Sequence, residues 1–227
     1  MVSAIIVAAG SGERVKGKVE KQFLLLAGIP VVVYALKVFE ETTSIDETLL
    51  VVPRGKAEWV EEEIVRRYGL AKVSRVLEGG ARRQDSVYQG LAFLDRGIVA
   101  VHDGVRPFVS AALVDVLVKE AEQSGAAVPA VGISDTIKSV EEGMVRRTLT
   151  REGMWLAQTP QVFKYELLKS AYDKAYEENY LASDDSALVE RLGYNVRIVE
   201  GSRRNIKITT EEDILLAEAL LKGRGPR

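Results

Sequence analysis

The sequence contains no cysteine among its 227 residues, which excludes disulfide bonds, thiolate metal sites and cysteine nucleophiles. It also lacks any apolar run close to the roughly 20 residues that cross a bilayer, and its opening residues, MVSAIIVAAG, lack the basic leader of a signal peptide. Charge of one sign is not in excess: the formal net charge is −2, which gives no general attraction to nucleic acid. We therefore expect a cytoplasmic protein whose partners include neither a membrane nor a nucleic acid.

Short apolar runs and amphipathic stretches alternate along most of the chain. This alternation is typical of an α/β fold, in which helices flank a mostly parallel sheet. The length suits a single domain over 1–227 that buries a core without the help of disulfides or metals. The pattern predicts strands within 4–9, 47–53, 72–80, 98–107, 126–131, 195–201 and 205–209, and helices within 30–41, 56–69, 85–94, 110–125, 165–178, 184–193 and 211–223.

Residues 134–153 interrupt this alternation. Their sequence, SDTIKSVEEGMVRRTLTREG, predicts two β-strands around a turn in which Gly143 can adopt a positive φ. The segment has few large apolar residues, so a hairpin here would be marginal unless something packs against it. We interpret it as a β-hairpin arm that reaches a partner subunit; a loosely folded flap is the alternative.

The segment AAGSGERV, residues 8–15, follows the first predicted strand and has the composition of a phosphate-binding glycine loop. Gly10 and Gly12 match a dinucleotide-binding loop, but Val15 stands at the third glycine position and no carboxylate ends the second strand. A P-loop is excluded because no Gly-Lys-Ser/Thr follows. Clustered cations suit a polyphosphate, although a solvated charged turn would have the same composition. These cations are Arg14, Lys16, Lys18 and Lys21.

Two later segments place polar groups beside predicted strand ends. EGGARRQDSV offers glycines for close backbone approach, with Arg83 and Ser86 where a helix begins. VHDGVRP places Asp103 at the sheet edge where open α/β sheets bind ligands. A carboxylate among so many cations suits Mg²⁺ bound to phosphates, although a helix-capping role would also explain it. His102, the only histidine, is more typical of a packed strand end than of a general base.

Two segments near the C-terminus have simple local interpretations. In NIKIT, strand alternation places Ile206 and Ile208 on one face and Lys207 on the other, where it either binds a ligand or is solvated on an edge strand. In SDDSALVE, Ser183 looks like a helix N-cap, with Asp184 and Asp185 as acidic residues of the first turn. That structural role is a sufficient explanation for both aspartates.

Together these segments resemble the 2-C-methyl-D-erythritol 4-phosphate cytidylyltransferase family of the non-mevalonate isoprenoid pathway. Three departures leave every charged group in place: Glu20 stands for a proline, Gly104 and Val105 for an alanine pair, and Ser183 for a threonine. The motifs run in family order from residue 8 to residue 209: AAGSGERV, KQF, GGARRQDSV, VHDGVRP, DTIK, REGMWLAQTPQVF, SDDSALVE and NIKIT.

The resemblance implies a Rossmann-like domain that forms a homodimer through the 134–153 arm. It also implies a reaction, in which the acceptor phosphate attacks the α-phosphorus of CTP and pyrophosphate leaves, with Mg²⁺ as cofactor. The implied catalytic cations are Arg14 and Lys21, and the implied acceptor-positioning residues are Arg151, Lys207 and Ser183. The implied nucleotide-binding residues are Ala8, Ala9, Gly10, Gly12, Gly80, Arg83, Ser86, Asp103 and Arg106, with Asp103 also a direct or indirect metal contact.

Four alternatives stay open at the level of sequence. A related cytidylyltransferase acting on ribitol 5-phosphate would share the CTP motifs and differ only around the acceptor. A sugar-phosphate uridylyl- or guanylyltransferase would differ in base choice. A non-catalytic nucleotide-binding module would not need both cation pairs. A dinucleotide-dependent oxidoreductase is disfavoured by the glycine spacing.

Overall fold

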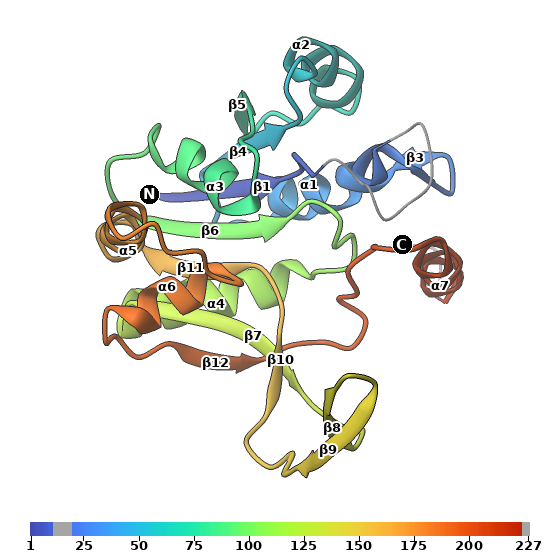
Figure 1. Cartoon of the computed structure of the whole chain (residues 1–227). Helices are drawn as coiled ribbons and strands as arrows, with labels where there is room; N and C mark the ends of the chain where they lie inside the picture. Colours follow the sequence, from blue (N-terminus) through green and yellow to red (C-terminus); the bar gives the residue numbers. More distant parts are fainter. Residues whose placement is uncertain (11–19, 224–227) are drawn as a thin grey trace.

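The central sheet collects strands from nearly the whole length of the chain (Figure 1). The computed structural model describes residues 1–10 and 20–223. The strand order is β10-β7-β11-β6-β1-β4-β5, and β12 pairs with β7 on the edge opposite β11. The strands of this sheet are β1 (Val2–Val7), β4 (Glu47–Val52), β5 (Val73–Glu78), β6 (Ile98–Asp103), β7 (Ala126–Gly132), β10 (Trp155–Ala157), β11 (Gln161–Lys164) and β12 (Arg197–Glu200).

Most of the pairings in this sheet are parallel, as the sequence predicts. β1 runs parallel to β4 and β6, β4 to β5, and β7 to β12. The antiparallel β10 and β11 were not predicted, because each is short and Pro160 separates them. β11 lies between β6 and β7, where Val162 and Phe163 are completely buried.

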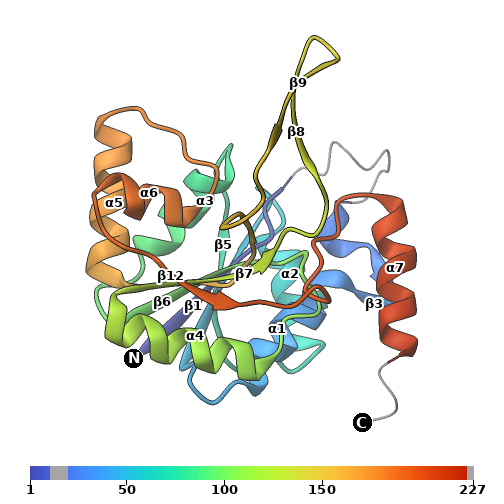
Figure 2. The ribbon, with the colours of Figure 1, turned by 90° about the horizontal axis from the view of Figure 1, so that it is seen from below.

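Helices cover both faces of the sheet (Figure 2). Along β1, Ile5 packs into a cluster with residues of α3, α5 and α6, whereas Ala4 and Ile6 pack against α1 and α4. Burial of alternate side chains on both faces explains why these strands read as continuous apolar runs. Within residues 1–10 and 20–223, no helix has the length and apolarity to cross a membrane. The helices are α1 (Val31–Glu41), α2 (Ala57–Val60, continued by a π-helical segment, Glu61–Arg66), α3 (Arg83–Leu91), α4 (Ala111–Ser124), α5 (Tyr165–Glu177), α6 (Asp185–Arg191) and α7 (Glu211–Lys222).

The carboxyl ends of the central strands form one edge of the sheet. Val7, the last residue of β1, is paired with Asp103 of β6 on one side and with Val51 of β4 on the other. Backbone N–H groups of Gly104 and Gly79 extend this edge by donating to Val7 O and Val52 O, respectively. The segments after β1, β5 and β6 therefore meet at one place, where open α/β sheets bind ligands.

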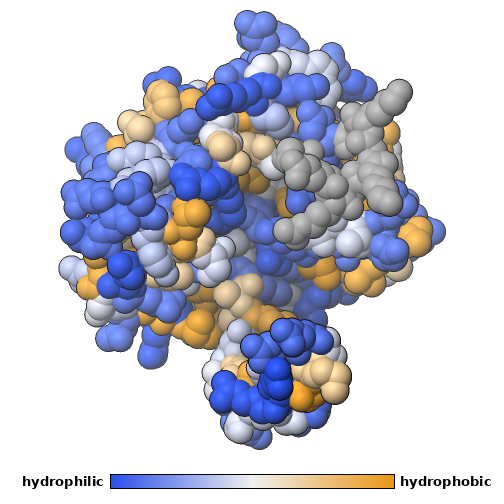
Figure 3. All heavy atoms as spheres, viewed as in Figure 1, coloured by the Kyte–Doolittle hydropathy of each residue, from blue (hydrophilic) through white to orange (hydrophobic). Residues whose placement is uncertain are grey.

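Residues 134–153 contain the predicted hairpin. It consists of β8 (Ile137–Glu141) and β9 (Met144–Leu149), and Gly143 has the positive φ that the turn requires, +77°. The hairpin projects from the body of the molecule (Figures 1 and 2). Apolar side chains lie on the surface of the hairpin between charged ones (Figure 3). Among them, Val140, Met144 and Val145 are all more than half exposed.

The prediction of a strand at residues 205–209 is wrong, since this segment forms no ladder with another strand. Its backbone contacts loops instead, for example through Ile208 N, which donates to Val105 O. The expected alternation survives without the strand: Ile208 is buried and Ile206 partly buried in a small cluster with α7, while Lys207 points to Asp103. The cluster also includes Leu26 of a short β-hairpin, β2 (Leu25–Leu26) with β3 (Ile29–Pro30), which follows a 3₁₀ turn (Lys21–Phe23).

Candidate active site

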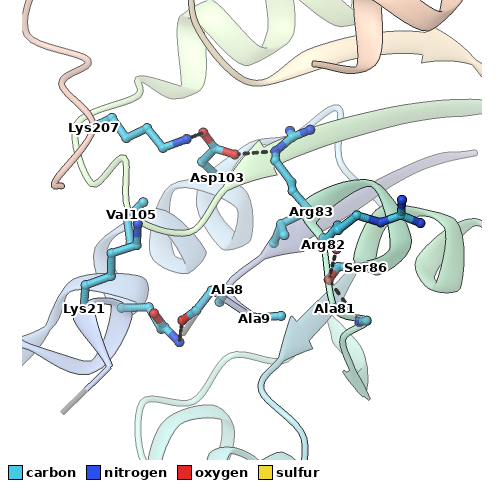
Figure 4. A pocket seen from close by; sticks show the side chains of 14 residues that line it. Ala8, Ala9, Lys21, Ala81, Arg82, Arg83, Ser86, Asp103, Val105 and Lys207 are labelled. Atoms are coloured by element: carbon cyan, nitrogen blue, oxygen red, sulfur yellow. Dashed lines mark hydrogen bonds and ion pairs between the residues drawn. The ribbon is translucent and has the colours of Figure 1, made fainter. Parts of the chain in front are cut away.

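A cavity of about 500 Å³ opens at the carboxyl ends of β1, β5 and β6 (Figure 4). This volume lies within the range of small-molecule sites in proteins, about 300–1,000 Å³. Its lining combines small residues on one side with charged ones on the other. Predicted site residues that line it are Ala8, Ala9, Gly10, Lys21, Gly80, Arg83, Ser86, Asp103 and Lys207.

The small residues allow three segments to approach one another closely. A Cβ atom placed on Gly79 would lie 2.3 Å from the Cβ of Ala9 and 2.8 Å from the Oγ of Ser86, so only glycine fits there. The Gly80 N–H donates to Ser86 Oγ over 3.2 Å, and the Ser86 hydroxyl donates to Arg82 O over 3.1 Å. Main-chain groups of β1, β5 and the start of α3 are thereby gathered around the cavity.

The Asp103 carboxylate lies at the opposite side of the cavity, between three cations. Its Oδ1 accepts a bond from Arg83 Nε at 2.9 Å and its Oδ2 accepts one from Lys207 Nζ at 2.8 Å, while Arg106 Nε lies 3.6 Å from Oδ2. Figure 4 shows Arg83 and Lys207 reaching the carboxylate from opposite sides. Burial alone would raise the pKa of Asp103, but the charges of Arg83, Lys207 and Arg106 hold it well below its usual range. The surrounding cations therefore hold Asp103 in its ionised form.

A second cavity, of about 240 Å³, lies on the far side of this charged cluster. Ser183, Thr159 and Gln158 contribute to its lining. The residues that line both cavities are Arg83, Asp103 and Lys207. These three side chains, which we call the shared wall, therefore face two cavities at once.

A buried hydrogen-bond network fixes the backbone on either side of Asp103. The Thr159 hydroxyl accepts from Asp103 N at 3.1 Å, which leaves its proton for His102 Nδ1 at 3.0 Å. His102 Nε2 faces Arg106 O at 3.2 Å, and since a carbonyl only accepts, Nε2 carries the ring proton. Asn205 joins the network by donating to Thr159 O and by accepting from Arg106 through its own carbonyl. The loops at 102–106, 158–160 and 205–207 are thus locked to one another.

Comparison with known proteins decides the family. The family model for 2-C-methyl-D-erythritol 4-phosphate cytidylyltransferase matches residues 2–223. The chain belongs to this family. The resemblance that the sequence motifs indicated is thereby confirmed.

Relatives and solved structures agree with this assignment over their full length. Enzymes of that description from Shouchella clausii and Pelotomaculum thermopropionicum are 46% and 45% identical to this chain, covering 98% and 100% of it and 97% and 96% of their own lengths. The crystal structure of the Thermus thermophilus enzyme aligns with a TM-score of 0.81 at 37% identity, covering 96% of this chain and 98% of that one. A 4-diphosphocytidyl-2C-methyl-D-erythritol synthase from Anaerococcus prevotii gives 0.85 at 33% identity, covering 97% and 96%.

The remaining predicted site residues have different surroundings. Lys21 lies in the 3₁₀ turn at the rim of the first cavity, and the adjacent Gln22 donates to Gly10 O at 3.2 Å. Arg151 lies at the base of the arm, donates to Ser134 O and lines neither cavity. Two predicted residues, Gly12 and Arg14, lie outside the described residues.

Residues at the start of α6 are only partly explained by helix capping. The N-cap is Asp184 and not the predicted Ser183: the Asp184 carboxylate accepts from Ala187 N at 3.0 Å and from Gln161 Nε2 at 2.7 Å. Asp185 does more than the sequence suggests, because it is completely buried and forms a bidentate ion pair with Arg83. Thr159, Asn205 and Gln161 were also missed; they lie in motifs quoted for the family, but nothing local in those motifs distinguishes them.

A divalent cation fits this site only if the substrate carries most of its ligands. Among residues 1–10 and 20–223, no group of three or more acidic or histidine side chains could hold a metal ion. Asp103 is a lone carboxylate whose two oxygens face cations. Mg²⁺ commonly keeps water ligands and binds through one or two carboxylates together with substrate phosphates, which matches a site of this kind.

The buried His102 makes stability depend on pH. Burial lowers the pKa of His102 to about 4, whereas an unfolded histidine titrates near 6.5. The unfolded state therefore binds more protons between these values, and the free energy of unfolding should fall as pH decreases from 7 to 4.5, by about 2–3 kcal/mol from this residue. Urea unfolding of wild type and His102→Gln across this range measures the effect. The variant should be less stable at pH 7 and should lose less stability on acidification; equal losses in the two proteins would contradict the prediction.

Proposed function

We propose that this chain transfers the cytidylyl group of CTP to the phosphate of 2-C-methyl-D-erythritol 4-phosphate, releasing pyrophosphate. Membership of the family makes it a CTP-dependent nucleotidyltransferase. The observation that carries the proposal is the shared wall, which presents Arg83 and Lys207 to two adjacent cavities. Two anionic substrates bound on either side of such a wall would have their phosphates drawn toward the same cations.

The reaction needs positioning and charge compensation more than it needs a base. An acceptor phosphate is already ionised near neutral pH, so the barrier lies in bringing anions together and in stabilising charge around the α-phosphorus. Lys21 and Lys207 both line the first cavity, and Lys207 also faces the second. We assign Lys21 to the triphosphate and Lys207 to the acceptor phosphate. Arg14 remains the predicted partner of Lys21, and Ser183 of Lys207.

Recognition of cytosine is assigned mainly to the main chain. Small residues at Ala8, Ala9 and Gly80 leave backbone amides and carbonyls accessible along one side of the first cavity. A cytosine presents an amino donor where uracil presents a carbonyl acceptor. A buried polar group left unpaired costs about 1–3 kcal/mol, which is enough for useful discrimination between the two bases.

The divalent cation is assigned to the triphosphate, with Asp103 as the protein carboxylate that would contact it. When bound, the ion would neutralise phosphate charge. This chain's own part is to keep Asp103 ionised and oriented. The bonds from Arg83 and Lys207 and the backbone bond from Asp103 N to Thr159 do this.

We further propose that the chain forms a homodimer through the arm at 134–153. The arm exposes apolar side chains that its own subunit does not cover, namely Val140, Met144 and Val145. A group of exposed apolar side chains on a projecting segment is typical of a contact site. Arg151, at the base of the arm, lines neither cavity of its own chain, as expected if the arm brings it to a site in the dimer. A cytoplasmic location remains a prediction.

Substrate choice is tested by pyrophosphate release. With Mg²⁺ present, release is expected only from CTP with 2-C-methyl-D-erythritol 4-phosphate, and not from UTP, GTP or ATP, because only cytosine satisfies the groups around Ala8, Ala9 and Gly80. The panel should be repeated with ribitol 5-phosphate as acceptor. Release with ribitol 5-phosphate instead would retain the mechanism and change the substrate. No release with any pair would refute the catalytic proposal and leave a nucleotide-binding module.

Lys207→Ala should reduce kcat/KM for the acceptor by on the order of a hundredfold, because it removes a preorganised charge donor from the shared wall. The value of kcat/KM for CTP at saturating acceptor should change much less. Steady-state kinetics with each substrate varied in turn measures both. Lys169→Ala is the matched control, since Lys169 also pairs with an aspartate, Asp173 at 2.6 Å, but lies on α5 and lines neither cavity. Equal effects in the two variants would exclude a specific role for Lys207.

The arm is tested by light scattering combined with size-exclusion chromatography. Wild type should elute as a dimer, and Val145→Glu should shift the protein toward monomer because it places a charge in the proposed interface. Phe93→Glu is the control: Phe93 is 52% exposed and lies against Arg75 of β5, at the opposite end of the sheet from β7 and β10, which flank the arm. A monomeric wild type, or a Val145→Glu variant that remains dimeric, would refute dimerisation through the arm.

A further inference from the structure

Asp185 is a completely buried carboxylate that lines neither cavity. It lies in the first turn of α6, where Asp184 already caps the helix by accepting from Ala187 N. A capping role therefore does not explain Asp185. Its position behind the shared wall also excludes direct contact with a ligand in either cavity.

Asp185 contacts the shared wall through Arg83. Its two oxygens accept from Arg83 Nη1 and Nη2 at 3.0 and 2.8 Å, and the Tyr172 hydroxyl donates to Oδ1. This fork-to-fork geometry fixes the guanidinium in both position and orientation. Arg83 Nε is left to hold Asp103 Oδ1, so that Asp103 presents its other oxygen to Lys207.

The contact between Asp185 and Arg83 also connects the segments that line the two cavities. Arg83 begins α3, directly after the Gly80 segment that lines the first cavity. Asp185 begins α6, two residues after Ser183, which lines the second. A buried ion pair is weak evidence of a stabilising role, because its desolvation cost can exceed the Coulombic gain. Its location between the two sides is the more informative observation.

The charges around Asp185 indicate which movement it prevents, namely that of Arg83 toward a bound triphosphate. Arg83, Arg106 and Lys207 face the two carboxylates Asp103 and Asp185. A triphosphate in the first cavity attracts Arg83, and Asp103 alone would hold it by a single bond. If Arg83 moved, Asp103 would lose the contact that orients it, and Lys207 would lose its own anchor. With Asp185 present, the wall keeps its geometry when the nucleotide binds.

We propose that Asp185 is a positioning residue which, by holding Arg83, preserves the binding of the acceptor phosphate when the nucleotide is bound. The inference rests on the proposed function, since it takes the first cavity for CTP and the second for the acceptor. It adds a role for a residue that touches neither substrate. Loss of Asp185 should weaken acceptor binding mainly when the nucleotide is present.

Isothermal titration calorimetry tests this in the presence of Mg²⁺. The affinity of 2-C-methyl-D-erythritol 4-phosphate is measured with and without a saturating CTP analogue in which a methylene group replaces the α,β-bridging oxygen, so that no transfer occurs. In wild type the acceptor should bind at least as tightly with the analogue as without it. In Asp185→Asn the acceptor affinity measured with the analogue should fall by roughly fivefold or more relative to wild type, within the usual range of coupling between sites, while each ligand alone binds nearly as before.

Two further variants keep the test decisive. Tyr172→Phe removes only the hydroxyl that donates to Asp185 and should reduce the acceptor affinity measured with the analogue less, in the same direction; it replaces Asp185→Asn if that variant does not fold. Glu178→Gln is the control, because Glu178, the residue after α5, forms a surface ion pair at 2.8 Å with Arg191, the last residue of α6. It should leave the acceptor affinity unchanged with and without the analogue.

The outcomes separate this inference from the proposed function. If the analogue weakens acceptor binding in wild type as much as in Asp185→Asn, or if Asp185→Asn binds the acceptor as tightly as wild type when the analogue is present, the inference is overturned and the proposed function stands. Equal weakening of every binding step in Asp185→Asn would indicate a merely structural residue and also overturn it. Wild type that binds neither ligand would overturn the proposed function and this inference together.

Discussion

The buried, ionised carboxylate of Asp103 is the constraint on which the rest of the site depends. Such a charge is costly to bury unless it is paired and hydrogen-bonded, so its surroundings must supply cations in fixed positions. Arg83 and Lys207 come from segments more than a hundred residues apart in the sequence, and each meets a different oxygen. The backbone of Asp103 must be equally fixed, which is what the Thr159 hydroxyl and the neutral His102 provide.

The sheet makes this arrangement possible. Since β1, β4, β5 and β6 are parallel, their carboxyl ends meet at one edge, and each following segment contributes a different kind of group there. The end of β1 contributes small residues, the start of α3 contributes arginine, and the end of β6 contributes the carboxylate. Asp185, at the start of α6, is completely buried between Arg83 of α3 and Tyr172 of α5, and this burial strengthens its attraction to Arg83.

Local patterns predicted the parts of the fold whose causes are local. Strands buried on both faces read as apolar runs, Gly143 indicated the turn of the arm, and SDDSALVE indicated the start of α6, although its cap is Asp184 and not Ser183. Features that depend on distant partners were missed. Residues 205–209 have the alternation of a strand, yet the backbone of Ile208 bonds to a loop; Asp185 resembles its neighbour in sequence, yet it pairs with an arginine 102 residues away. Adjacent identical side chains therefore have different roles, which only the tertiary structure distinguishes.

The division between arginine and lysine in the shared wall follows from the same constraint. The guanidinium of Arg83 is planar, and its Nε and both Nη atoms already donate to carboxylates, so it acts as a fixed part of the protein. Lys207 instead carries a compact ammonium with three donors on a flexible stem. Its pairing with Asp103 requires only one of these donors, so the carboxylate can orient the ammonium without preventing it from meeting a phosphate. A wall in which arginine holds the carboxylate and the carboxylate orients a lysine combines rigidity with a cation that can follow its substrate.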